Sequence, residues 1–110
     1  MSKASIELEA CAPFVKEMAS PDFDKMQMRE KLLEQDKSLL YALIAILEAG
    51  RTAYMCDHIT QASNPTKMFA KHKQAAKANH TEDIAGAVDY ILTKILLHHY
   101  MRSAIKIFSL

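Results

Sequence analysis

The feature that most constrains this chain is an unbroken apolar run over residues 39–47, LLYALIAIL. Its Leu and Ala content and its lack of alternation predict a helix rather than a half-buried strand. The run has nine residues, whereas a helix that crosses a membrane needs about 20. Because a helix that is apolar on every face is normally surrounded by other elements, we expect this one at the centre of a helical core.

Composition indicates one helical domain. The chain has 110 residues, of which 50% are hydrophobic and 25% charged, with two Gly and three Pro. Such a length and so few loop-forming residues indicate one compact domain with short connections. A disordered tail is excluded, since such segments combine low hydrophobicity with high net charge, and the formal net charge is +1. We predict an all-α fold in which residues 1–110 form a single-domain bundle of four to five helices, with a long C-terminal helix.

Proline and capping signals predict the first helices. Ser20 can cap a helix whose first residue is Pro21, where the missing N–H of proline costs nothing. This pair predicts a helix over residues 21–35. An apolar segment before it is also expected to be helical, and Pro13 breaks or restarts that segment.

The central helix is expected to begin at a capping aspartate. Asp36 precedes a helical pattern over residues 37–49. Gly50 then either ends this helix or kinks it. Residues 52–62 have helical content again.

Two further start signals define the C-terminal half of the chain. Asn64 followed by Pro65 predicts the start of a helix over residues 66–78. Thr81, followed by two acidic residues, is a good cap for the last element. From there, residues 81–108 predict one long helix.

The polar positions of this long helix recur every four residues and form one stripe: Lys94, His98, Arg102 and Lys106. Most of its other positions are apolar, and they form an arc too wide for a helix on the surface of a small bundle. Either several neighbouring helices cover that arc, or part of it contacts a second subunit.

Charge is divided unevenly between the two parts of the chain. Residues 1–36 carry five Lys/Arg and eight Asp/Glu, a net charge of −3, and residues 37–110 carry nine and five, a net charge of +4. These segments should attract each other, within one chain or between two subunits.

Cysteine usage and the start of the chain indicate a cytoplasmic protein. Cys11 and Cys56 are far apart, and neither has a second cysteine nearby, so no disulfide framework or four-thiolate zinc site is indicated. We expect reduced thiols. No basic start followed by an apolar core marks a signal peptide.

No residue pattern predicts catalysis, a metal or a cofactor. His98 and His99 are about 100° apart on a helix and cannot bind one ion from the same face. Cys56, Asp57 and His58 bring three ligand types together, but no further ligand converges with them. The scarcity of Gly leaves no turn for an oxyanion hole or a phosphate cradle. We therefore expect a non-enzymatic protein whose histidines are surface or partly buried polar residues.

The strongest functional signal is the basic segment 67–80, which has four lysines and no acidic residue. Together with the segment before it, it forms a helix-turn-helix-like stretch over residues 53–78. Its only base-reading side chains are Gln74 and Asn79, with no Arg, which favours a solvated surface over a nucleic-acid interface. The candidate anion or nucleic-acid contacts are Lys67, Lys71, Lys73, Lys77, Lys94 and Arg102.

Two stretches resemble a family of short bacterial helical proteins, the domain of unknown function 3775. The first is residues 40–51, LYALIAILEAGR, an apolar helix that ends in a Gly-Arg pair. The second runs from Asp89 to Ile105 and is similar to the C-terminal helix of that family. The resemblance implies an all-helical bacterial protein. Since that family has no established activity, no functional residues are implied.

Two hypotheses follow from the sequence. The first is a helical protein that acts through self-association or protein–protein interaction, as a homodimer. It rests on the excess of apolar helix surface for a chain this short. The second is a nucleic-acid-binding regulator that uses the basic residues of 53–78.

Overall fold

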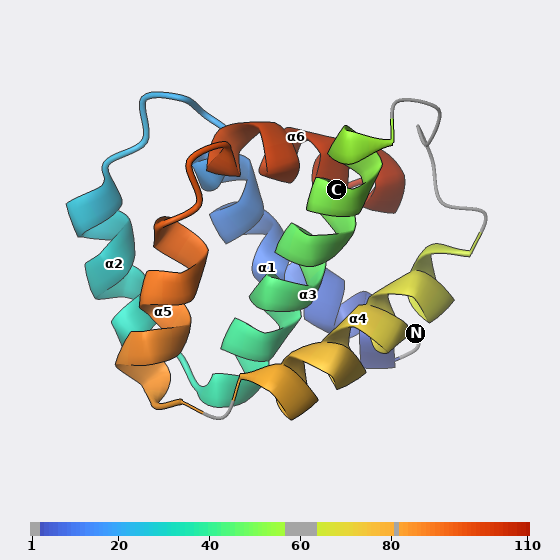
Figure 1. The fold of residues 1–110 in the computed structure, drawn as a ribbon, viewed down its shortest axis with the longest axis horizontal. Helices are drawn as coiled ribbons and strands as arrows, with labels where there is room; N and C mark the ends of the chain where they lie inside the picture. The colour runs from blue at the N-terminus through green and yellow to red at the C-terminus, as the bar shows by residue number, and fades with distance from the viewer. Residues whose placement is uncertain (1–2, 57–63, 81) are drawn as a thin grey trace.

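A computed structural model describes residues 3–56, 64–80 and 82–110, and these residues form six α-helices and no strand (Figure 1). The all-α prediction is confirmed, with six helices in place of four to five. Within the described residues, no helix combines the length and the apolar content needed to cross a membrane. The helices are α1 (Lys3–Met18), α2 (Lys25–Leu33), α3 (Lys37–Met55), α4 (Pro65–Asn79), α5 (Ile84–Leu92) and α6 (Leu97–Phe108).

Helix α3 lies at the centre of the fold, as its apolar run predicts. Figure 1 shows α6 across its upper end, and α3 also contacts α1, α4 and α5. Side chains on all sides of α3 are fully buried, among them Leu40, Leu43, Ile44, Ile46 and Leu47. Removing these side chains from water is the main driving force for folding of this domain. Neighbouring helices of the same chain therefore cover this apolar run.

Gly50 does not end the central helix, because α3 continues to Met55. The residue lies where α6 crosses α3. A Cβ atom built on Gly50 would be 2.1 Å from the backbone oxygen of Tyr100. The absence of a side chain therefore allows the two helix backbones to approach closely.

The prediction of one long C-terminal helix is wrong, because the chain breaks between α5 and α6. The Thr93 hydroxyl donates to the backbone oxygen of Asp89 at 2.8 Å, and the Thr93 amide donates to the same oxygen at 3.0 Å. A single turn then leads into α6, where the Leu97 amide donates to the oxygen of Lys94 at 3.3 Å. The break turns the two apolar segments in different directions, so that α5 packs on α2 and α3 while α6 packs on α3 and α1. Two differently directed helices thus bury an apolar arc that one straight helix would expose.

The N-terminal boundaries also differ from the prediction. α1 continues through Pro13 without a break. α2 begins at Lys25 instead of Pro21, because Asp24 is the side chain that accepts the Gln27 amide, at 3.1 Å. The Ser20 hydroxyl accepts the Asp22 amide at 3.4 Å in the preceding turn.

Of the other three predicted caps, two are confirmed and one is replaced. Asp36 accepts the Leu39 amide at 2.8 Å, and Asn64 accepts the Lys67 amide at 3.0 Å. The cap of α5 is Asp83, which accepts the Gly86 amide at 2.8 Å. The predicted cap, Thr81, lies outside the described residues.

Candidate functional site

Helix α4 carries four of the predicted cationic contacts, and the structure separates them. Lys67, Lys71 and Lys77 are exposed on its outer face, and α4 contains no acidic residue. Lys73, one turn before Lys77, instead forms an ion pair with Glu7 of α1, and only 11% of its side chain is exposed. This pair joins an acidic residue of the N-terminal segment to a basic residue of the C-terminal one, as the division of charge predicts for a single chain.

The other two predicted cations are engaged in contacts within the chain. The Nζ atom of Lys94 lies 3.9 Å from the centre of the Tyr90 ring, a favourable cation–π arrangement. The Nε atom of Arg102 donates to the backbone oxygen of Ala19, just beyond the end of α1, at 3.1 Å. The six predicted cations therefore do not converge on one surface, and three of them share the outer face of α4.

An aromatic cluster joins the end of α3 to the start of α6. The Tyr54 ring stacks on His99 with ring centres 5.3 Å apart and meets Tyr100 edge to face at 5.6 Å. His98 lies beside His99, with ring centres 4.0 Å apart. Sequence reasoning missed this cluster, because its members are about 45 residues apart and meet only through the α3–α6 crossing.

Exposed apolar side chains gather beside this cluster. Among the described residues, the exposed large hydrophobic side chains are Ile6, Met26, Tyr54, Met55, Ile95 and Leu96. Four of these six belong either to the last two residues of α3 or to the turn before α6. We call this group, Tyr54, Met55, Ile95 and Leu96, the α3–α6 edge.

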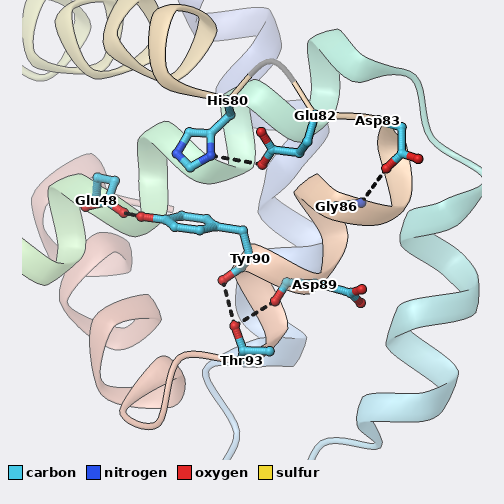
Figure 2. A network of polar contacts seen from close by, with 8 residues as sticks. All are labelled: Glu48, His80, Glu82, Asp83, Gly86, Asp89, Tyr90 and Thr93. Carbon is cyan, nitrogen blue, oxygen red and sulfur yellow. Dashed lines mark hydrogen bonds and ion pairs between the residues drawn. The ribbon is translucent and has the colours of Figure 1, made fainter.

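A network of polar contacts links α3, α5 and the residues between α4 and α5 (Figure 2). Figure 2 shows the Tyr90 side chain extending from α5 toward Glu48 of α3, to which its hydroxyl donates at 2.5 Å. The His80 ring lies against the Tyr90 ring, with centres 4.2 Å apart, and its Nδ1 atom is 3.1 Å from Oε1 of Glu82. These side chains form one connected cluster between α3 and α5.

The pKa values of Tyr90, in this network, and of His72, near it, are shifted in opposite directions. Burial, together with the hydrogen bond to Glu48, raises the pKa of Tyr90 to about 12, because the carboxylate opposes loss of the hydroxyl proton. Burial lowers the pKa of His72, which lies on the neighbouring face of α4, although Glu48 acts in the opposite direction. His72 is therefore mostly neutral at pH 7.

The two cysteines are free thiols. Cys11 is fully buried, and burial together with Glu7 raises its pKa to about 12, so its thiolate is scarce at neutral pH. Cys56 is half-buried, whereas Asp57 and His58, its predicted companions, lie outside the described residues. Within the described residues, no group of three His, Cys, Asp or Glu side chains is arranged to hold a metal ion.

Comparison with family models, curated proteins and solved structures finds no match for this chain. The resemblance to the domain of unknown function 3775 therefore stays a prediction.

Proposed function

We propose that this protein acts through self-association, as a homodimer whose interface is the α3–α6 edge. The observation that supports this proposal is the concentration of exposed apolar side chains on that edge. Ile95 is 93% exposed, Met55 68%, Tyr54 37% and Leu96 36%. Grouped apolar side chains on a surface are typical of interaction sites, whereas single ones need no explanation.

The Tyr54 ring of the α3–α6 edge is held in place by contacts within the chain. Tyr54 is held between His99 and Tyr100 by ring contacts. The Tyr100 amide donates to the backbone oxygen of Leu96 at 3.0 Å, which fixes the first turn of α6. Aromatic side chains that are held in place before binding lose little conformational entropy when a partner arrives. The edge therefore has the rigidity expected of the centre of an interface.

A second copy of the chain is the partner that this surface suits best. In a two-fold symmetric dimer, each copy presents the same patch to the other. The four side chains of the edge are uncharged, so the patch meets itself without like-charge repulsion. Contact between two such edges removes apolar surface of both copies from water, which stabilises the dimer.

The test is to replace Ile95 with Asp and measure molar mass by size-exclusion chromatography with light scattering. The wild-type chain is expected to be a dimer at micromolar concentration. The I95D variant is expected to dimerise about 100-fold more weakly, because each interface loses two isoleucines and buries two carboxylates.

Ile6→Asp is the matched control, since Ile6 is also exposed but lies on α1, away from the edge. It is expected to leave the dimer intact. A wild-type monomer at micromolar concentration, or equal weakening by both variants, contradicts the proposal.

The outer face of α4 supports a second candidate function, binding to a nucleic-acid backbone. Lys67, Lys71 and Lys77 are exposed there and face no acidic residue of their own helix. If all three contact phosphates, the logarithm of affinity should fall with the logarithm of salt concentration with a slope of about −3. Fluorescence anisotropy with a labelled duplex measures that slope.

Replacing Lys67, Lys71 and Lys77 together with Glu is expected to abolish this binding. Lys16→Glu on α1 is the control for net charge. Absence of binding at low salt, or equal loss in the control, ends this second hypothesis.

A further inference from the structure

A cavity of about 200 Å³ opens between α3, α4 and α5, and none of the residues that line it belongs to the α3–α6 edge. Its apolar lining comes from Ile44 and two alanines of α4. Its polar lining comes from three helices and the residue after one of them. These residues are Glu48 of α3, His72 and Asn79 of α4, His80 just after α4, and Tyr90 of α5. Concave sites of this kind, with an apolar lining and a few converging polar groups, are the usual form of small-ligand sites.

The charge of the cavity comes from Glu48, the one acidic or permanently cationic residue in its lining. The Glu48 side chain is 26% exposed, and one of its oxygens accepts the Tyr90 hydroxyl at 2.5 Å. Its other oxygen lies 3.6 Å from Nη1 of Arg51, whose side chain is half-exposed and does not line the cavity. An exposed pair at that distance is weak, so the carboxylate keeps an oxygen available to a ligand.

The other polar groups of the cavity add acceptors and an aromatic ring. The imidazole of His72, mostly neutral at pH 7, makes no side-chain hydrogen bond within the described residues. The contact of Nδ1 of His80 with Glu82 leaves its Nε2 atom for another partner. Lys94, outside the cavity lining, already places an ammonium 3.9 Å from the centre of the Tyr90 ring. This face of the Tyr90 ring therefore already has a cation of the chain as its partner, and a ligand would bind through the acceptors of the cavity.

We propose that this cavity binds a small organic cation, a primary ammonium or guanidinium compound. The Glu48 carboxylate supplies the opposite charge, and the neutral His72 imidazole supplies an acceptor. An anion would meet the negative charge of Glu48, which Arg51 offsets only weakly at 3.6 Å. A volume of about 200 Å³ is that of roughly seven water molecules, which is enough for a ligand of roughly five to ten non-hydrogen atoms.

The experiment titrates the protein with n-butylammonium and follows backbone amide shifts by nuclear magnetic resonance. n-Butanol and butyrate serve as the neutral and anionic probes of the same length. n-Butylammonium is expected to shift Glu48, His72, Asn79 and Tyr90 saturably in the millimolar range, and the other two probes are not. Equal shifts with butanol, larger shifts with butyrate, or no saturable shift with any probe overturn the proposal.

Three variants complete the test. Glu48→Gln keeps an acceptor for Tyr90 but removes the charge, and is expected to weaken binding at least about tenfold. Glu30→Gln removes one charge from the exposed surface of α2 and is expected to have no effect. Equal weakening by both variants overturns the proposal.

Ala75→Leu is the variant that tests the cavity itself. Ala75 is exposed and lines the cavity, so the larger side chain can fill the space without disturbing the core. This variant is expected to abolish binding of n-butylammonium. If Glu48→Gln does not fold, Ala75→Leu still tests the proposal. Undiminished binding by Ala75→Leu overturns the proposal.

Discussion

Replacing Gly50 with Ala is expected to lower the free energy of unfolding by about 2 kcal/mol or more, measured by urea denaturation followed by circular dichroism. The added Cβ atom would lie 2.1 Å from the backbone oxygen of Tyr100 and 3.0 Å from the Cβ atom of Ala104. Both neighbours belong to α6, so the helix as a whole has to move away from α3. The loss of close packing outweighs the gain of about 1 kcal/mol that Ala brings to a helix interior.

Gly86→Ala is the matched control for this prediction. A Cβ atom on Gly86 would meet the Cγ and Cβ atoms of Glu82 at 2.6 and 2.9 Å, so the residues just before α5 have to shift locally, but no other helix has to move. We expect a change within about 1 kcal/mol. A Gly50→Ala variant as stable as the wild type would show that α6 does not need its close approach to α3.

Replacing Lys73 with Met is expected to lower the free energy of unfolding by about 3 kcal/mol. The ion pair with Glu7 is mostly buried, since the side chains of Lys73 and Glu7 are 11% and 19% exposed. Glu7 lines a second, smaller cavity next to Cys11, so loss of the lysine leaves a carboxylate without its partner in a poorly solvated place. Removing one member of such a pair lowers the free energy of unfolding by more than the intact pair contributes to it.

A double-mutant cycle separates the contribution of the intact ion pair from the cost of leaving Glu7 without a partner. The Glu7→Leu/Lys73→Met protein is expected to recover most of the stability lost in Lys73→Met, because no uncompensated charge remains. Lys71→Met, at an exposed position of the same helix, is expected to change stability by less than about 0.5 kcal/mol. A double variant no more stable than Lys73→Met would show that the lysine acts through packing and not through charge.

The parts of the fold that could be predicted from sequence depend on residues that lie close together in the sequence. The apolar run around Ile44 defines the core, and the caps Asp36 and Asn64 act on amides three residues away. The errors occur where two local signals compete. Ser20 and Asp24 both precede helical sequence, and only the structure shows that Asp24 makes the cap. Similarly, periodicity continues across Thr93, although α5 ends at Leu92 and α6 begins only at Leu97.

The candidate sites were less predictable, because they depend on contacts distant in sequence. Nothing near Lys73 distinguishes it from Lys71, and it is Glu7, 66 residues earlier, that draws it inward. The cavity at Glu48 likewise requires Tyr90, which is 42 residues later. Patterns of residue type identified the exposed lysines of α4 but could not indicate which side chains converge.

The contacts of α1 have a consequence for synthesis of the chain. α1 packs against α3, α4 and α6, and the residue just beyond its end, Ala19, receives its hydrogen bond from Arg102, 83 residues later. α1 therefore leaves the ribosome well before α6, one of the helices that cover its apolar face. During that interval Val15 and Met18, fully buried in the finished protein, are open to other proteins. Nascent chains of this kind are substrates for chaperones that bind exposed apolar helices.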